Sequence, residues 1–283
     1  MIRQKSTAKI ATGDDGVDVF YWHNYTPGMN KPTIVMHPGG GFNHSSYLPL
    51  EKALNEKGYP TLIVEPRGVG YSQAPSKPEF YTLEAYSKDL QKIVEQEGLE
   101  KPSFFAHSFG FMPTVDYVAR TQNAKDITGA CVSNNFAKTT FKGGTWAFGN
   151  LLPITDCLSS LFCYGVHKLK GEVRPDYPDQ SNLEGKGASS YLFAINDIPL
   201  KQVLNHFLTN RGITSWDVSE QLGKIKTPIH LIHGSKDFMV MPFAAEMIKE
   251  LAAGQVTSDK LDLDHTIPYK APKMVADIIE RYV

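Results

Sequence analysis

Short apolar segments alternate with longer amphipathic segments along most of this chain, and this alternation limits the folds that the chain can adopt. The apolar segments lie at 33–37, 60–65, 102–106, 127–132 and 229–232, with a weaker one at 259–263. A short continuous apolar run that ends in turn residues is typical of a strand buried on both faces, as in a parallel sheet. We therefore predict an α/β fold with a mostly parallel central sheet and helices on both faces.

The segments between these runs have the 3.6-residue spacing of helices. We expect helices at 47–58, 82–97, 109–120, 243–252 and 270–282. The first two end at Gly58 and Gly98, and glycine is the residue that most often terminates a helix. Residues 9–25 form two predicted strands joined by the Asp-Asp-Gly turn at 14–16.

The alternation disappears between about residues 134 and 222, where the chain is rich in aromatic, glycine and short apolar groups. We interpret 134–222 as a cap inserted into one core domain that consists of 1–133 and 223–283. Within the cap, 146–166 is mostly apolar but is interrupted by glycine, proline and polar residues, so we do not expect a membrane span. It fits either a cap helix packed on the core or a lid that lines an acyl pocket or contacts lipid aggregates.

The charge balance excludes some partners. The 283 residues carry 29 basic and 30 acidic side chains, a net charge of −1. This balance argues against nucleic acid as the main partner, because phosphate binding needs clustered Lys and Arg. Residues 1–10 contain no apolar segment of the secretory-signal kind, and three cysteines are too few for a disulfide framework. We therefore expect a cytoplasmic protein.

The most informative segment is 104–111, Phe-Phe-Ala-His-Ser-Phe-Gly-Phe, where a predicted strand turns directly into a predicted helix. Ser108 lies at the bend, and such a turn lifts its hydroxyl clear of the sheet edge. The positions two residues before and after must be small because strand and helix pack closely there; Ala106 and Gly110 meet this requirement. Ser108 is therefore a candidate nucleophile, and its alternative role is to cap a helix.

A nucleophilic serine needs a base, and the base needs a carboxylate that orients it. Asp237 and His265 follow the last two predicted strands, at the sheet edge where α/β proteins place their sites. We predict Asp237 as the acid and His265 as the base. Asp262 and Asp264 are weaker alternatives for the acid, because they flank the histidine and would point away from its ring.

The loop after the first apolar run, residues 37–42, reads His-Pro-Gly-Gly-Gly-Phe. Glycines allow backbone N–H groups to approach a substrate oxygen closely. The amide of Phe109, which follows the candidate nucleophile at a predicted helix N-terminus, is a further donor. We predict that the amides of Gly39, Gly40 and Phe109 form an oxyanion hole.

The order of these segments resembles that of the α/β-hydrolase superfamily. Residues 106–110 are similar to its G-x-S-x-G nucleophile elbow, with alanine for the first glycine, and 65–72 (Glu-Pro-Arg-Gly-Val-Gly-Tyr-Ser) are similar to its D-x-R-G-x-G-x-S segment. We interpret the second segment as structural, a tight loop held by Arg67. The chain most resembles the capped esterase, monoacylglycerol lipase and serine aminopeptidase-like members.

The resemblance implies a serine hydrolase that needs no cofactor. Serine at 108 differs from the aspartate expected of epoxide hydrolases and haloalkane dehalogenases. Because 37–42 departs from an H-G-G-P-G loop and the cap has an apolar first half, we expect a small-molecule carboxylic ester as substrate, such as a monoacylglycerol or lysolipid. A serine aminopeptidase or a C–C bond hydrolase is the alternative. A non-catalytic ligand-binding protein is disfavoured because all three triad candidates are present.

The remaining histidines do not predict a metal site. His230 and His233 are three residues apart on a predicted strand and face opposite sides, so the pair cannot chelate an ion. His37 and His44 flank the glycine loop without a carboxylate cluster, and we interpret His107 as a packing residue. Neither glycine loop has a nucleotide-binding pattern. We therefore expect no metal and no cofactor.

Overall fold

The structure, a computed structural model, covers the predicted core and the two ends of the predicted cap. It describes residues 7–25, 28–40, 42–73, 75, 78–135, 139, 215–237 and 239–283. Most of the cap predicted at 134–222, including 146–166, lies outside the described residues, so this domain division stays a prediction. Among the described helices, none is long and apolar enough to cross a bilayer.

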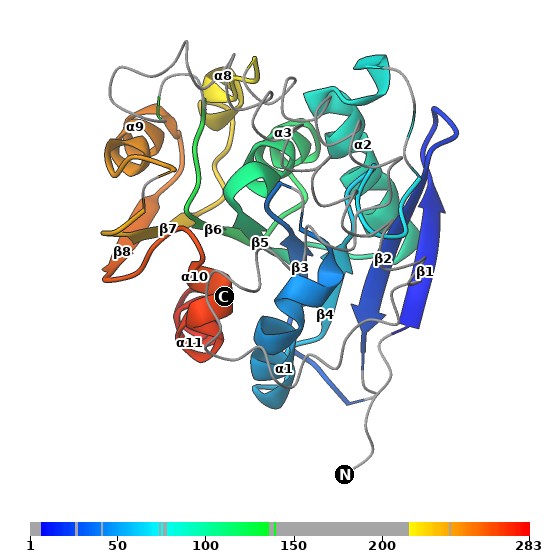
Figure 1. The fold of residues 1–283 in the computed structure, drawn as a ribbon, viewed down its shortest axis with the longest axis horizontal. Coiled ribbons are helices and arrows are strands. Elements are labelled where there is room, and N and C mark those ends of the chain that lie inside the picture. Colours follow the sequence, from blue (N-terminus) through cyan, green and yellow to red (C-terminus); the bar gives the residue numbers. More distant parts are fainter. Residues whose placement is uncertain are drawn as a thin grey trace, which may run out of the picture.

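An eight-stranded sheet runs through the described fold in the order β1-β2-β4-β3-β5-β6-β7-β8 (Figure 1). The strands are β1 Thr7–Thr12, β2 Asp18–Asn24, β3 Ile34–His37, β4 Thr61–Val64, β5 Ser103–His107, β6 Asp126–Ala130, β7 Ile229–Gly234 and β8 Val256–Leu261. Neighbours from β3 to β8 are parallel, whereas β2 pairs antiparallel with β1 and β4. The predicted mostly parallel sheet is confirmed, and β1 and β2 form the predicted hairpin.

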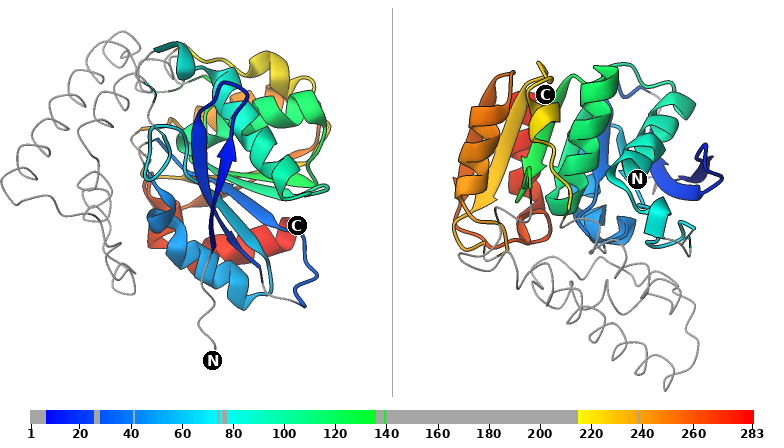
Figure 2. Two further views of the ribbon diagram at one scale, coloured as in Figure 1. Left: turned by 90° about the vertical axis from the view of Figure 1, so that its right-hand side faces the viewer. Right: turned by 90° about the horizontal axis from the view of Figure 1, so that it is seen from above.

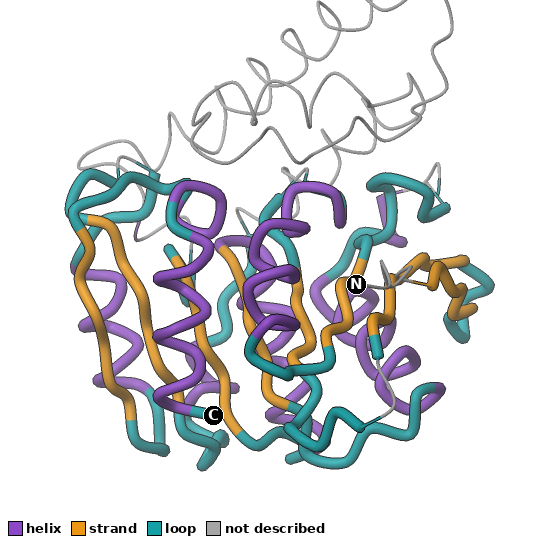
Figure 3. The backbone as a smooth tube through the Cα atoms, turned by 90° about the horizontal axis from the view of Figure 1, so that it is seen from below, coloured by secondary structure: helices purple, strands orange, loops and turns teal. Residues whose placement is uncertain are grey.

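Helices cover both faces of the sheet (Figures 2 and 3). The helices are α1 Leu48–Glu56, α2 Leu83–Gln96, α3 Phe111–Thr121, α8 Ser219–Leu222, α9 Phe243–Leu251, α10 Ile267–Lys270 and α11 Pro272–Tyr282, with short 3-10 helices η1 His44–Tyr47, η2 Pro78–Phe80 and η3 Ser108–Gly110. One apolar core lies between the sheet and α2, α3, α8 and α9, and a second lies between the sheet and α1, α10 and α11. Burial of these two faces is the main stabilising contribution.

Two predicted segments differ from the structure. The strand predicted at 259–263 is β8, which begins at Val256 and ends at Leu261. It lies at the sheet edge and is only partly buried, so its polar residues hide the strand pattern. The helix predicted at 270–282 is α11, which begins at Pro272, whereas Lys270 ends the separate helix α10; Ala271 between them precedes a proline and has a non-helical backbone (φ −135°, ψ 50°).

The two ends of the predicted cap lie side by side. The Val218 amide donates a hydrogen bond to the Asn134 carbonyl (3.0 Å), and Asn134 Nδ2 donates to Ser219 Oγ (3.0 Å). Asn135 Nδ2 donates to Asp217 Oδ2 at 2.7 Å. The described residues on either side of this interval are therefore hydrogen-bonded neighbours, as the prediction of an inserted cap requires.

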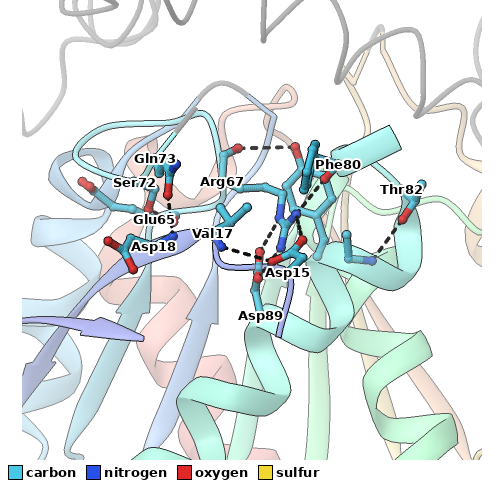
Figure 4. Close-up of polar contacts among 12 residues, drawn as sticks. Asp15, Val17, Asp18, Glu65, Arg67, Ser72, Gln73, Phe80, Thr82 and Asp89 are labelled. Atoms are coloured by element: carbon cyan, nitrogen blue, oxygen red, sulfur yellow. Dashed lines mark hydrogen bonds and ion pairs between the residues drawn. The ribbon is translucent and has the colours of Figure 1, made fainter. Parts of the chain in front are cut away.

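Arg67 joins three segments near the β1–β2 hairpin (Figure 4). Its guanidinium group is almost fully buried and forms a two-pronged ion pair with Asp89 of α2, in which Nε lies 2.7 Å from Oδ2. Its Nη1 donates to Asp15 Oδ2 (2.7 Å) and to the Phe80 carbonyl (2.8 Å). A buried guanidinium on the loop after β4 thus joins the hairpin turn, the end of η2 and the middle of α2.

Replacing Arg67 should therefore destabilise the fold. Arg67→Met leaves Asp89 buried without its cation, and we expect a loss of about 3–5 kcal/mol in the free energy of unfolding. Urea denaturation followed by circular dichroism measures this change. The control is Arg281→Met, which removes a largely exposed ion pair with Asp259 and should cost less than about 1 kcal/mol. Similar losses in the two variants would contradict the role assigned to Arg67.

Candidate active site

Ser108 is the first residue of η3 and directly follows β5, at a sharp turn of the chain. Its φ is +49°, a left-handed conformation that is unusual for serine and is typical of strained functional turns. Ala106 is fully buried and pairs with His37 of β3. A methyl group built on Gly110 would lie 2.4 Å from the His37 carbonyl oxygen. Gly110 is therefore required because the elbow touches the loop after β3, a neighbour that the sequence analysis did not foresee.

Ser108, His265 and Asp237 meet at the carboxyl edge of the sheet. His265 Nε2 lies 3.0 Å from Ser108 Oγ, and His265 Nδ1 lies 2.9 Å from Asp237 Oδ2. An ionised carboxylate only accepts hydrogen bonds, so Nδ1 carries the proton and Nε2 is free to accept the serine proton. All three side chains are less than a tenth exposed. The structure thus brings together the three residues that the sequence analysis singled out from distant parts of the chain.

Asp237 remains ionised although it is buried. Burial alone raises the pKa of its carboxyl group, but the hydrogen bonds and the charge interaction with His265 outweigh this effect and leave the pKa below its usual value. Its Oδ1 also accepts the amides of Met239 (2.8 Å) and Val240 (3.0 Å). These contacts hold one carboxylate oxygen so that the other faces the imidazole.

The two alternative acids face other partners. Asp262 binds Ser235 Oγ and Lys236 Nζ on the surface. Asp264 accepts hydrogen bonds from the amide and hydroxyl of Thr266 and pairs with Lys270. Asp264 therefore braces the loop that carries His265, whereas Asp237 is the carboxylate bonded to the ring.

The glycine loop differs in one respect from the predicted oxyanion hole. The Gly39 amide donates to Tyr47 Oη at 2.8 Å, so this N–H group is already engaged and the prediction for Gly39 needs correction. Gly40 lies beside the elbow, since a methyl group built on it would be 3.6 Å from Phe109 Cβ. The amides of Gly40 and Phe109 remain the candidate donors. Gly41 lies outside the described residues.

Two further histidines beside the site are buried and neutral. Burial lowers the pKa of His37 to about 4, and burial together with the nearby His265 lowers the pKa of His107 to about 3. His107, interpreted from sequence as a packing residue, bonds through both ring nitrogens, to Tyr47 Oη and to the His265 carbonyl. Neither residue spacing nor hydrophobic pattern signals a role for Tyr47, because only the fold brings it to the elbow.

Cys131 lies next to the acid, directly after β6. Donor atoms of Cys131, Asp237 and His265 lie within 4.8 Å of one another. Burial and the neighbouring Asp237 raise the pKa of the thiol, so it stays protonated. The thiol donates to the Asp264 carbonyl oxygen at 4.0 Å, and Asp237 and His265 are bonded to each other.

The chain is similar to known proteins of one fold. A sequence profile described as the alpha/beta hydrolase fold matches residues 32–147. A curated relative named proline iminopeptidase, from Saccharolobus solfataricus, is 22% identical over 259 residues, 85% of this chain and 81% of the relative. A second protein of that name, from Lactobacillus acidophilus, is 21% identical over 247 residues, 79% of this chain and 80% of the relative.

Solved structures of hydrolases superpose over nearly the whole chain. An esterase from Exiguobacterium antarcticum matches with a TM-score of 0.77 and 16% identity, over 98% of this chain and 99% of the esterase. An enol-lactonase from Burkholderia xenovorans LB400 matches with a TM-score of 0.73 and 19% identity, over 97% and 99% of the two chains. The predicted α/β-hydrolase fold is confirmed.

The buried neutral histidines predict a loss of stability in acid. His37 has a pKa of about 4 in the folded chain and about 6.5 when unfolded, so the unfolded chain binds the proton first as the pH falls. Its contribution to stability is complete above pH 6.5 and declines by about 1.4 kcal/mol per pH unit down to about pH 4. Urea denaturation between pH 7 and pH 5 measures this slope.

The matched variant is His37→Asn, whose amide can still donate to the Pro38 carbonyl that His37 Nδ1 contacts at 3.3 Å. We expect its slope to be smaller than that of the wild type by about 1.4 kcal/mol per pH unit below pH 6. Measurements at pH 8, where both proteins are uncharged at this position, report the packing change alone. Equal slopes in the two proteins would contradict the assignment.

Proposed function

We propose that this member of the α/β-hydrolase superfamily is a serine hydrolase that cleaves carboxylic esters through an acyl-enzyme on Ser108. The observation that carries the proposal is the continuous hydrogen-bond chain Ser108 Oγ–His265 Nε2 and His265 Nδ1–Asp237 Oδ2, at 3.0 and 2.9 Å. Hydroxyl, imidazole and carboxylate in this order activate serine as a nucleophile. The reaction uses side chains and backbone amides of this chain.

In the first step Ser108 Oγ forms a bond to the ester carbonyl carbon while His265 Nε2 takes the hydroxyl proton. Asp237 stabilises the imidazolium that results. The carbonyl electrons move to the oxygen, which accepts hydrogen bonds from the amides of Gly40 and Phe109. When the carbonyl re-forms, the alcohol leaves with the proton from His265. Water then attacks the acyl-enzyme through the same base and releases the acid and the free serine.

The triad and the oxyanion hole do not determine which acyl group and leaving group the protein accepts. The loop His-Pro-Gly-Gly-Gly-Phe at 37–42 and the apolar first half of 134–222 favour an ester with an apolar acyl group, such as a monoacylglycerol or lysolipid. Contact of the cap with lipid surfaces and a cytoplasmic location belong to the same proposal. Fold alone does not select a substrate.

A serine aminopeptidase is the second candidate. It is favoured by the curated relatives named proline iminopeptidase, three of which match about four-fifths of this chain. The same triad would cleave an amide by the same steps, with an amine as the leaving group. A C–C bond hydrolase is a further alternative and lacks a comparable observation in its favour.

The nucleophile is tested by covalent labelling. A fluorophosphonate probe should label the folded protein at Ser108, because the oxygen is activated and the probe resembles the tetrahedral intermediate. Ser108→Ala should abolish labelling and lower kcat for p-nitrophenyl esters by about 10⁴-fold or more. Peptide mass spectrometry locates the label. Ser235→Ala, which changes a serine bonded to surface Asp262, should label normally. A folded wild-type protein that stays unlabelled would contradict the proposal.

The substrate class is tested by comparing the hydrolysis of ester and amide substrates. We expect kcat/KM for p-nitrophenyl esters, measured over acyl chains of increasing length, to exceed kcat/KM for prolyl-p-nitroanilide. The esters release p-nitrophenol and the anilide releases p-nitroaniline, each followed by its own absorbance, and Ser108→Ala supplies the background rate for each. A higher kcat/KM for the prolyl anilide would replace the ester proposal with the aminopeptidase and would leave the triad assignment intact.

A further inference from the structure

A chain of buried hydrogen bonds links the glycine loop to the backbone of His265. The Gly39 amide donates to Tyr47 Oη at 2.8 Å, and Tyr47 Oη lies 2.9 Å from His107 Nδ1. His107 Nε2 lies 3.0 Å from the His265 carbonyl oxygen. Tyr269 Oη lies 3.0 Å from Tyr47 Oη. The side chains of Tyr47, His107 and Tyr269 are buried, so water does not compete for these contacts.

The donor and the acceptor in each hydrogen bond follow from the groups at the two ends of this hydrogen-bond chain. A carbonyl oxygen only accepts, so His107 Nε2 carries a proton. A neutral imidazole has one N–H group, so Nδ1 is bare and accepts the proton of the nearer hydroxyl, Tyr47 Oη at 2.9 Å, rather than Tyr269 Oη at 3.4 Å. The Tyr47 oxygen then has only lone pairs left, and these accept from the Gly39 amide and the Tyr269 hydroxyl. The opposite tautomer of His107 would remove the donor from the His265 carbonyl and reverse Tyr47.

We infer that His107, held as the neutral Nε2–H tautomer, and Tyr47 are positioning residues that set the glycine loop and the base at fixed places around Ser108. The inference rests on the proposed function, because it assigns these residues a role in hydrolysis. His107 is bonded covalently to Ser108, through a hydrogen bond to the backbone of His265, and through Tyr47 to Gly39. One residue therefore links the nucleophile, the backbone of the base and the glycine loop.

On the loop side, the Tyr47 oxygen fixes the Pro38–Gly39 peptide, which is adjacent to the peptide that carries the Gly40 amide. A methyl group on Gly39 would lie 2.7 Å from His107 Nδ1, so loop and ring are already in close contact. Without the hydroxyl, the Gly39 amide would be a buried donor with no acceptor, and the loop would turn to satisfy it. The next amide, that of Gly40, would then leave its place opposite Phe109, and an oxyanion donor acts only at the correct distance.

On the base side, the His107 ring holds the peptide of His265 and adds no charge beside it. The two ring centroids are 5.2 Å apart. A second cation at this distance would oppose protonation of His265 during the reaction. A neutral donor therefore fits this position better than a lysine or arginine, which could also reach a carbonyl oxygen.

The first test compares two tyrosines. Tyr47→Phe keeps the ring and removes the hydroxyl, and we expect kcat for p-nitrophenyl acetate to fall by about 10- to 100-fold with KM changed less than about two-fold, since the loss concerns the transition state. The control is Tyr117→Phe, another fully buried tyrosine, whose hydroxyl accepts a hydrogen bond from Asn123, just after the C-terminal end of α3. The control should keep kcat. An unchanged kcat in folded Tyr47→Phe would overturn the inference.

The second test uses amides that replace one ring nitrogen each. In His107→Asn the side-chain oxygen can accept from Tyr47 at the position of Nδ1, and in His107→Gln the amide nitrogen can donate to the His265 carbonyl at the position of Nε2. We expect both variants to retain more kcat than His107→Leu, which lacks both contacts. Equal kcat in the three variants would show that His107 acts by packing alone and would overturn the inference.

A third readout does not depend on activity. In wild-type protein labelled with ¹⁵N-histidine, NMR should show His107 with Nε2 protonated and Nδ1 unprotonated, unchanged between pH 5 and pH 8. An Nδ1–H tautomer would overturn the inference even if every His107 and Tyr47 variant failed to fold. Fluorophosphonate labelling of the same sample separates the two failures, because a correct tautomer without labelling at Ser108 would contradict the proposed function instead.

Discussion

Parallel pairing of β3, β5, β6 and β7 is the constraint on which the site depends. His37 pairs with Ala106, His107 pairs with Ala130, and Ala130 pairs with Ile232. These four strands therefore end close together at one edge, and each releases its next loop there. The loops carry the glycines, the elbow, Cys131 and Asp237. A shift in register of one residue would turn each strand's side chains to the opposite face and separate these groups.

Burial determines which groups of the candidate site are ionised. Asp237 stays ionised because it accepts several hydrogen bonds, whereas His37 and His107 lose their protons and the Cys131 thiol keeps its own. Among these groups the single fixed charge is therefore the carboxylate bonded to His265. His265 is bonded to this ionised carboxylate, which stabilises its protonated form, whereas His37 and His107 are buried and stay neutral. The proton of Ser108 therefore transfers to His265 rather than to either of these neighbours. The same burial of neutral histidines makes the fold sensitive to acid.

The sequence predicted those features that depend on local pattern or chain order. Buried strands such as β5 show as continuous apolar runs, and the positions of Ser108, Asp237 and His265 follow from what comes directly after a strand. Edge strand β8 was placed too late because its partly buried residues alternate poorly. A glycine in the sequence indicates that a backbone amide can be approached closely, but it does not show where that amide points. For this reason the sequence pattern includes Gly39 among the oxyanion donors, although its amide is bonded to Tyr47. The partner that engages its amide, Tyr47, lies on a 3-10 helix, and its contact with His107 depends on the packing of the fold.

The C-terminal end of the predicted cap packs against the turn that carries Ser108. Trp216 packs against Phe109 and Tyr86, with ring centroids 5.4 and 5.5 Å apart, and Tyr86 packs edge-on against Phe109 at 5.1 Å. Phe109 supplies an amide of the proposed oxyanion hole, so the end of the insertion contacts the catalytic turn directly. Asn134 and Val218 also join the two ends of the predicted cap. In the proposed division into core and cap, the core carries the proposed triad, and the cap, attached beside Phe109, contributes to the choice of substrate.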